Sequence, residues 1–310
     1  MKELTVRSNS IVQSFDRDKL LSRFVEFADI SNASVHTYVK GIKQLFKFFA
    51  ERRICIPTRE NIVEFKKHLV ANGRSANTIN LYIACIKKFF TWLEVEGLYT
   101  NITTGIKGVK VSRNFKKDAL SAEQLKQVVN GIDTHTEKGL RDLAMTSLMA
   151  VCGLRSIEVV RANVGDIRNV NGQAVLGVVG KGHSEADDFV NIPAQVLRIL
   201  QAYLNERGTV SSHEPLFTST ARRNKGQRLT TRTVSGVVKI ALRNVGYNTP
   251  RITCHSLRHT AITLALMNGM SLQEVQQFAR HAQINTTLVY AHNIDKINSR
   301  CECAVANTIF

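Results

Sequence analysis

The stretch that decides the fold begins HSLRH at residues 255–259, passes ARH at residues 279–281 and ends TTLVY at residues 286–290. Apolar residues after HSLRH recur at helical spacing until Gly269, which predicts the end of one helix. Ser271 then has the position of an N-cap, with polar residues in the turn behind it, and predicts a second helix. We therefore expect two packed helices, followed by a loop that carries the final tyrosine.

The composition favours a polyanionic partner. The chain has 310 residues, enough for two ordinary domains, and a formal net charge of +17 with a pI near 9.9. Such a basic surface favours nucleic acid, and no apolar run approaches the ~20 residues that a membrane span needs. The first residues, MKELT, lack the apolar core of a signal peptide. We expect a cytoplasmic protein at the nucleoid.

The six cysteines do not predict a metal site. They are scattered, and none has zinc-finger spacing. Without a secretory context they are best interpreted as small buried apolar residues. We expect no metal.

Residues from about 16 to 104 have the pattern of helices joined by short loops. Three of these helices place lysines opposite their apolar face. Each such face alone is equally well explained as a solvated surface. Their recurrence favours contacts to DNA phosphates. The lysines predicted to make these contacts are Lys40, Lys43, Lys47, Lys87 and Lys88.

A basic segment at residues 106–117 predicts a linker. Beyond it the pattern is again mainly helical, apart from two apolar runs around residues 175–179 and 189–192, which predict a small β-hairpin. The chain is thus expected to be mainly α, within the α+β class. A loop with Arg222 and Arg223 is a further predicted DNA contact.

Several basic side chains have the chemistry that phosphoryl transfer needs. Arg155 and Arg258 can each place a guanidinium fork on phosphate oxygens and neutralise charge that builds in the transition state. His281 can donate a hydrogen bond to the same phosphate.

A tyrosine, a histidine and a lysine can carry the proton transfers. Tyr290 is the predicted nucleophile, but a free phenol has a pKa of about 10 and needs a base. His255 is the predicted base, and Lys181, at the hairpin tip, is the predicted acid for the leaving oxygen. This chemistry needs no metal ion, nucleotide or other cofactor.

Together these residues resemble the tyrosine recombinases, the phage-integrase and Xer-like family. HxxRH alone is a weak motif, but an ordered set over more than 130 residues is highly specific. The residues that carry the resemblance are HSLRHT at 255–260, the spacing from His281 to Tyr290, GLR at 153–155 with Glu158, and GKG at 180–182.

The resemblance implies a division into domains. Residues 1–105 match the family's helical, SAM-like core-binding domain, residues 106–117 a linker, and residues 118–310 the catalytic domain with a C-terminal tail.

The resemblance also implies a reaction. Tyr290 would attack a scissile phosphate, forming a 3′-phosphotyrosyl link and freeing a 5′-hydroxyl. Exchange would pass through a Holliday junction in a homotetramer on two duplex core sites, without ATP. Arg155, Lys181, His255, Arg258 and His281 would activate the phosphate, and Glu158 would support them from behind.

Two departures from the family pattern concern the surroundings of this set. Ala279-Arg280 stands where the family usually has Leu-Gly, and the arginine either shifts the loop that sets His281 or adds a phosphate contact. Acidic residues at 185, 187 and 188 follow the GKG turn, where basic residues are common in the family.

Integration or excision of a mobile element is the favoured role, and an Xer-type resolvase of chromosome or plasmid dimers is the alternative. Other classes are a catalytically silent DNA-binding protein, a type IB topoisomerase, and a metallohydrolase that uses His255, His259 and His281. An accessory factor that sets direction is possible. The apolar residues after Tyr290 predict a tail that docks on a neighbouring protomer.

Overall fold

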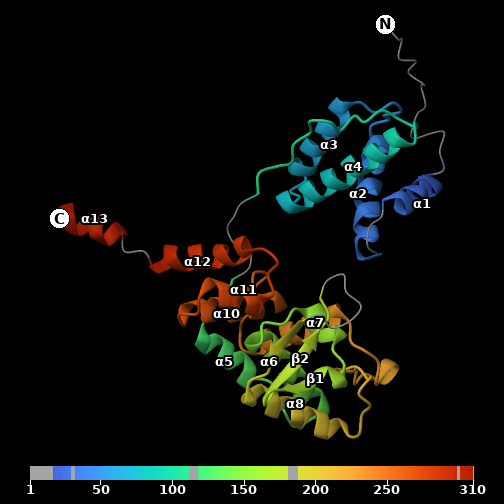
Figure 1. The fold of residues 1–310 in the computed structure, drawn as a ribbon. Helices are drawn as coiled ribbons and strands as arrows, with labels where there is room; N and C mark the ends of the chain where they lie inside the picture. The colour runs from blue at the N-terminus through green and yellow to red at the C-terminus, as the bar shows by residue number, and fades with distance from the viewer. Residues whose placement is uncertain (1–16, 29–31, 112–117, 181–187, 299–300, 310) are drawn as a thin grey trace. The chain divides into compact units, whose positions relative to one another are not determined.

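The computed structural model describes residues 17–28, 32–111, 118–180, 188–298 and 301–309 (Figure 1). The chain divides into two compact units, residues 1–113 and 114–310. Helices predominate in both, and the β-structure of the described residues is one small antiparallel sheet in the second unit. The predicted fold class is confirmed. None of the described helices is long and apolar enough to cross a membrane.

Four helices build the first unit around an aromatic core. Trp92 and Phe89 are fully buried and pack against Phe24, with ring centroids 5.7 and 5.3 Å from its own. Edge-to-face and tilted contacts of this kind stabilise a core beyond the area they bury. The helices are α1 (Arg17–Phe27), α2 (Asn32–Glu51), α3 (Arg59–Ala71) and α4 (Ala76–Val95).

The predicted basic faces differ between helices. On α2, Lys40, Lys43 and Lys47 are exposed. On α4, Lys87 and Lys88 are only half-exposed, and the Lys88 ammonium donates a hydrogen bond to the carbonyl of Ala28. Helix α2 therefore presents the more accessible lysine row.

The start of the predicted linker packs on the first unit. Ile106 is buried in its core. Asn80 holds the backbone of Val109 from both sides, donating to its carbonyl at 2.9 Å and accepting from its amide at 2.7 Å. The packed unit thus reaches several residues beyond the predicted domain end at residue 105.

The second unit begins with three helices and the sheet. The elements are α5 (Ala122–Asn130), α6 (Glu137–Val151), α7 (Ser156–Arg161), the 3₁₀ turn η1 (Val164–Asp166), β1 (Ile167–Val170), β2 (Gln173–Val178) and β3 (Asp188–Asn191). Helices follow: α8 (Ala194–Arg207), the 3₁₀ turn η2 (Arg222–Asn224), α9 (Thr231–Asn244), α10 (Cys254–Met267), α11 (Leu272–Ala279), α12 (Ile284–Asn298) and α13 (Cys301–Ile309).

The sheet has the order β1-β2-β3, with both pairs antiparallel. The predicted strands are present as β2 and β3, and Leu176 pairs with Val190. Strand β1 was not predicted, because its residues IRNV are mostly exposed and lack the apolar alternation that marks a strand.

Helix α6 is the centre of the second unit. Its residues from Ala144 to Ala150 are all buried, and it packs against α8 and α10. Apolar side chains of the sheet, Leu176 and Val190 among them, join the same core. The end of α6 and the start of α7 are thereby held against α10, which carries HSLRH.

The two helices predicted around residues 255–281 are present as α10 and α11. Ser271 caps α11 and forms a capping box with Glu274, as the sequence indicates. The predicted loop around Tyr290 was wrong, because this residue lies inside α12. Ile284, Leu288 and Ala291 recur at spacings of four and three, a helical period that spans the tyrosine.

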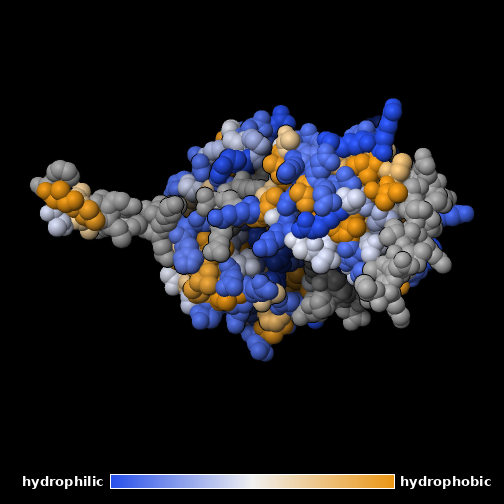
Figure 2. All heavy atoms as spheres, turned by 90° about the horizontal axis from the view of Figure 1, so that it is seen from above, coloured by the Kyte–Doolittle hydropathy of each residue, from blue (hydrophilic) through white to orange (hydrophobic). Residues whose placement is uncertain are grey.

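Helix α13 follows with its described side chains exposed. Val305 and Ile309 are 58% and 68% exposed. Figure 2 shows hydrophobic side chains of this C-terminal helix on the surface.

Candidate active site

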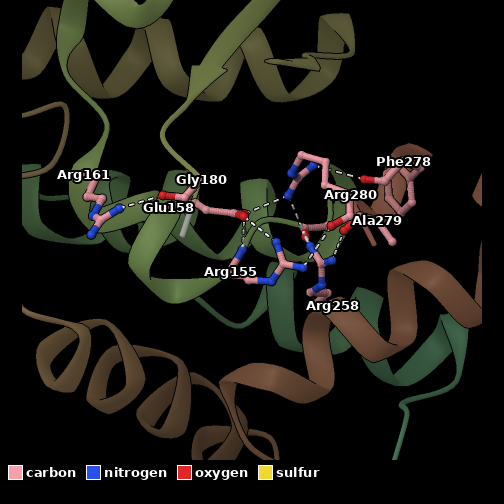
Figure 3. Close-up of polar contacts among 9 residues, drawn as sticks. Arg155, Glu158, Arg161, Gly180, Arg258, Phe278, Ala279 and Arg280 are labelled. Atoms are coloured by element: carbon pink, nitrogen blue, oxygen red, sulfur yellow. Dashed lines mark hydrogen bonds and ion pairs between the residues drawn. The ribbon is translucent and has the colours of Figure 1, made fainter. Parts of the chain in front are cut away.

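Arg258 lies at the centre of the site. It comes from the first turns of α10 and is only 6% exposed. Its guanidinium donates hydrogen bonds to the carbonyls of Gly153 and Ala279, which follow α6 and end α11 (Figure 3). Burial, and then the charges of Arg155 and Arg280, lower the pKa of Arg258 to about 9. An anion beside it would offset this repulsion, because opposite charge favours the ionised form.

The turn at Gly153 brings two of these elements together. Its φ is +62°, a region that glycine adopts freely and residues with a Cβ rarely do. A Cβ here would also lie 3.0 Å from the ring of Phe278 at the end of α11. Glycine is therefore required for both the conformation and the close approach, and it turns the carbonyl towards Arg258.

Arg155 and the buried Glu158 form an ion pair at the start of α7. The guanidinium of Arg155 donates to one carboxylate oxygen of Glu158 at 2.7 Å, and the backbone amide of Arg155 donates to the other at 2.7 Å. The carboxylate lies inside the second unit, with a side chain only 3% exposed. Arg155 is thus the ion-pair partner of Glu158 at the start of α7, while its side chain remains 36% exposed.

Arg280 points into the protein. Its backbone is left-handed, with φ 51° and ψ 50°, at the C-terminal end of α11. The side chain, 8% exposed, donates to the second oxygen of Glu158 at 2.7 Å and to the carbonyl of Phe278 at 3.0 Å. The sequence left open whether this arginine shifts the loop before His281 or contacts phosphate; in the structure its side chain is paired with Glu158 and its left-handed backbone lies directly before His281.

His281 is oriented by α12. Its Nδ1 lies 2.9 Å from the hydroxyl of Thr287, which is fully buried. Burial, and then Arg258 and the other nearby arginines, lower the pKa of His281 to about 4. At neutral pH it is thus a neutral ring, whose orientation is fixed by the threonine hydroxyl.

Tyr290 contacts both histidines of the site. Its hydroxyl lies 2.6 Å from Nδ1 of His259, and its ring stacks on that of His281 with centroids 6.2 Å apart. Burial raises the pKa of Tyr290 to about 12, although Arg258 and Arg155 act in the opposite direction. Burial, and then the neighbouring His255 and Arg258, lower the pKa of His259 to about 4.

These values decide where the proton of the pair lies. Burial raises the pKa of the Tyr290 phenol and lowers the pKa of the His259 ring, so proton transfer from Tyr290 to His259 is strongly unfavourable in this conformation. The proton therefore stays on the phenol, which is hydrogen-bonded to a neutral histidine. The structure thus shows Tyr290 as a neutral phenol hydrogen-bonded to His259 and not as a phenolate.

For the remaining predicted site residues, the structure gives fewer contacts. His255 lies exposed in the first turn of α10. Lys181 lies outside the described residues, although the carbonyl of Gly180 before it accepts a 2.9 Å hydrogen bond from Arg161 (Figure 3). Arg222 and Arg223 are exposed in η2, and the structure assigns them no role.

Sequence reasoning missed the contacts of one residue in particular. His259 was considered only as a metal ligand, yet it is the histidine that contacts the tyrosine; its place one residue after Arg258 was the available signal. Among the described residues, no group of three or more His, Cys, Asp and Glu side chains lies close enough to hold a metal ion.

Comparisons with known proteins agree with this geometry. Residues 118–296 match the model of the phage integrase family, and residues 23–97 match the phage integrase N-terminal SAM-like domain. Tyrosine recombinase XerD of Halalkalibacterium halodurans is 28% identical over 288 residues, which cover 88% of this chain and 92% of that protein.

Two solved structures share the fold. One is the XerH site-specific recombinase bound to a palindromic difH substrate in a post-cleavage complex, with a TM-score of 0.73 and 20% identity over 94% of this chain and 87% of that chain. Another is a lambda integrase tetramer bound to a Holliday junction, with a TM-score of 0.66 and 20% identity over 93% and 80% of the two chains. The predicted resemblance is confirmed, and the chain belongs to the phage integrase family, as one of its tyrosine recombinases.

Proposed function

We propose that this protein is a site-specific recombinase that cuts and rejoins duplex DNA through Tyr290, and that it integrates or excises a mobile element. The observation that carries the proposal is the meeting of α7, α10, α11 and α12 at one point. There Arg258 and Arg155 lie close enough to Tyr290 to act on the ionisation of its phenol. Membership of the tyrosine recombinases supports the same reaction.

The first step binds the scissile phosphate. Arg258, already fixed by two carbonyls, and Arg155, whose side chain is 36% exposed, each offer a guanidinium fork to the non-bridging oxygens. His281 donates a further hydrogen bond. The phosphate thereby takes up the excess positive charge that lowers the pKa of Arg258.

The second step transfers the phosphoryl group. The hydroxyl of Tyr290 leaves His259 and attacks phosphorus, its proton passes to a base, and the 5′-oxygen leaves with a proton from an acid. We assign the base to His255 and the acid to Lys181. The phosphotyrosyl bond keeps the energy of the broken phosphodiester, so the reverse attack by a 5′-hydroxyl can rejoin a strand.

The N-terminal unit holds the duplex in this scheme. Lys40, Lys43 and Lys47 on the exposed face of α2 contact phosphates, with Lys87, Lys88, Arg222 and Arg223 as further contacts.

Four protomers assemble on two core sites, and the exposed apolar face of α13 docks on a neighbour. The solved lambda integrase tetramer on a Holliday junction supports this arrangement. The protein acts in the cytoplasm, on the nucleoid.

A role in resolving chromosome or plasmid dimers is the second candidate. The curated relative from Halalkalibacterium halodurans is a XerD recombinase, and its match extends over most of both chains. The two candidates share one chemistry and differ in the DNA sites they use. The target sequence therefore decides between them.

The test captures that target. The protein is incubated with fragmented genomic DNA of its host and denatured, and the DNA that stays covalently attached is sequenced. Tyr290→Phe serves as the negative variant. Tyr247→Phe is the matched control, because it removes another hydrogen-bonded phenol of the same unit, 2.5 Å from Gln127.

We expect adducts at one or a few sites with the wild type and Tyr247→Phe, and none with Tyr290→Phe. A site in a mobile element supports integration, and a site where replicated chromosomes or plasmids are resolved supports the second candidate. Adducts spread over all sequences would instead indicate a topoisomerase. DNA binding without any adduct would contradict the proposal and leave a DNA-binding protein.

A further inference from the structure

One buried carboxylate in the site is shared by two arginines. Glu158 accepts from Arg155 on one oxygen and from Arg280 on the other, each at 2.7 Å, and the backbone amide of Arg155 also reaches the second oxygen (Figure 3). The two guanidinium groups approach the carboxylate from different sides. Its side chain is only 3% exposed, so water contributes little to its solvation.

The two arginines differ in their freedom to leave. The side chain of Arg155 is 36% exposed, whereas that of Arg280 is 8% exposed and also bonded to the carbonyl of Phe278. A phosphate arriving from solvent can therefore draw the guanidinium of Arg155 away. Arg280 stays where it is.

Leaving a buried carboxylate without its partner is strongly unfavourable. With Arg155 as its only guanidinium partner, Glu158 would compete with the phosphate for that group. Arg280 removes this competition, because its charge remains beside the carboxylate after Arg155 has turned. Burial raises the pKa of Glu158, but the charge of Arg280 and the hydrogen bonds and charge of Arg155 together outweigh it, so the net shift of the pKa is downward.

The left-handed backbone at Arg280 is unfavourable in conformational free energy. A left-handed conformation is unfavourable for a residue with a Cβ, and glycine would adopt it freely. The cost of an arginine at this position is offset by the ion pair with Glu158, which glycine cannot make.

We propose that Arg280 is a positioning residue: it acts as a second counter-ion that keeps Glu158 paired, and so frees Arg155 to bind the scissile phosphate. This rests on the proposed function for the identity of the phosphate, although the pairing itself can be tested with inorganic phosphate.

The experiment is a double-mutant cycle read out as the affinity for inorganic phosphate. Wild type, Arg280→Gly, Glu158→Gln and the double variant are titrated by calorimetry, and each is first melted to establish that it folds. Arg53→Gly is the matched control, because Arg53 is an exposed arginine with a similar φ of 54° and no part in the site.

We expect Arg280→Gly to weaken phosphate binding about tenfold, the typical size of the effect of removing a charged hydrogen bond. Glu158→Gln should change the affinity of the wild type by less than about twofold, the scatter of independent sites. In the Arg280→Gly background the same substitution should recover most of the affinity, because a neutral amide needs no counter-ion. Arg53→Gly should have no effect.

Equal effects of Glu158→Gln in both backgrounds would overturn the proposal, since a general effect of net charge is additive. If Arg280→Gly does not fold, Arg280→Gln completes the same cycle, because an amide removes the charge but keeps a polar side chain beside Glu158. Phosphate affinity needs no strand cleavage, so a failure of the cycle is distinct from a failure to form DNA adducts. Adduct rates of the same four proteins give a second readout, in which the same coupling is expected.

The pH dependence adds a readout that a purely structural role would not change. The charged groups of the described residues that face Glu158 are Arg155, Arg258 and Arg280. Without Arg280, protonation of Glu158 in acid releases Arg155, so the defect of Arg280→Gly should shrink as the pH falls towards 4.5, the ordinary pKa of this group. A defect that is constant with pH would contradict the counter-ion role.

Discussion

The site has an arginine side, around Arg258, and a tyrosine side, around Tyr290. The two sides differ in how closely they are arranged for binding and reaction. On the arginine side, Arg258 is fixed by two carbonyls and carries a pKa lowered by burial and by its neighbours, a state that an arriving anion relieves. On the tyrosine side, Tyr290 is buried and protonated, and its hydroxyl is hydrogen-bonded to His259. The difference indicates that the guanidinium group of Arg258 is already in place to bind an anion, whereas the phenol of Tyr290 is neutral and hydrogen-bonded to a histidine.

The largest effect is expected from a substitution on the arginine side. Arg258→Lys keeps a charge but cannot reach the carbonyls of Gly153 and Ala279 and a phosphate together. We expect strand cleavage to fall on the order of 10²–10³-fold, as when one preorganised donor to a transition state is removed. Single-turnover adduct formation measures this. The exposed Arg232→Lys on α9 is the control, and equal rates for the two variants would contradict the assignment.

The second prediction concerns how the stability of the protein depends on pH, through the two histidines that contact Tyr290. His259 and His281 have pKa values lowered from 6.5 to about 4, so between these pH values the unfolded chain binds protons that the folded chain does not. The free energy of unfolding must therefore fall as the pH falls from 6.5 towards 4. After a discount for partial exposure, we expect on the order of 2 kcal/mol for each histidine. Urea titrations at several pH values measure it.

The variant His259→Gln should remove about half of this slope, and His281→Gln the other half. Glu158 adds a smaller change at lower pH: its pKa is lowered, so its contribution is present above 4.5 and is lost as the pH falls below that value. An unfolding free energy that stays constant from pH 6.5 to 5 would contradict the neutral histidines.

The third prediction concerns the hydrogen bond between Tyr290 and His259. Tyr290→Phe and His259→Ala remove the two ends of that bond. In a double-mutant cycle on stability we expect a coupling of about 1 kcal/mol, the usual net value of such a bond. A coupling near zero would mean that the tyrosine is not held by His259.

The smallest effect concerns the first unit. Replacing Lys40, Lys43 and Lys47 by alanine should weaken binding to all duplexes alike. The slope of log affinity against log salt should become shallower by about 0.9 for each phosphate that is no longer neutralised. Alanine at Lys88, whose ammonium is bonded to Ala28, should change the slope less. The reverse order would place the duplex on α4.

The sequence predicted the helices that carry the site, but not the contacts between its side chains. Helices α10 and α11 followed from periodicity and from the cap at Ser271, and the mainly helical class followed from the same pattern. Strand β1 was missed, since an exposed edge strand has no apolar alternation. The direction of Arg280 was not predictable either, because a left-handed backbone at an arginine and a carboxylate 122 positions away leave no mark on local sequence.

The most direct test of the account is the location of the DNA adduct on the protein. Covalent complexes are digested with nuclease and protease, and the peptide that retains a nucleotide is identified by mass spectrometry. The account predicts one modified peptide, with the phosphate on Tyr290 and a free 5′-hydroxyl on the released strand. A nucleotide on any other residue, or a 5′-linked adduct, would contradict it.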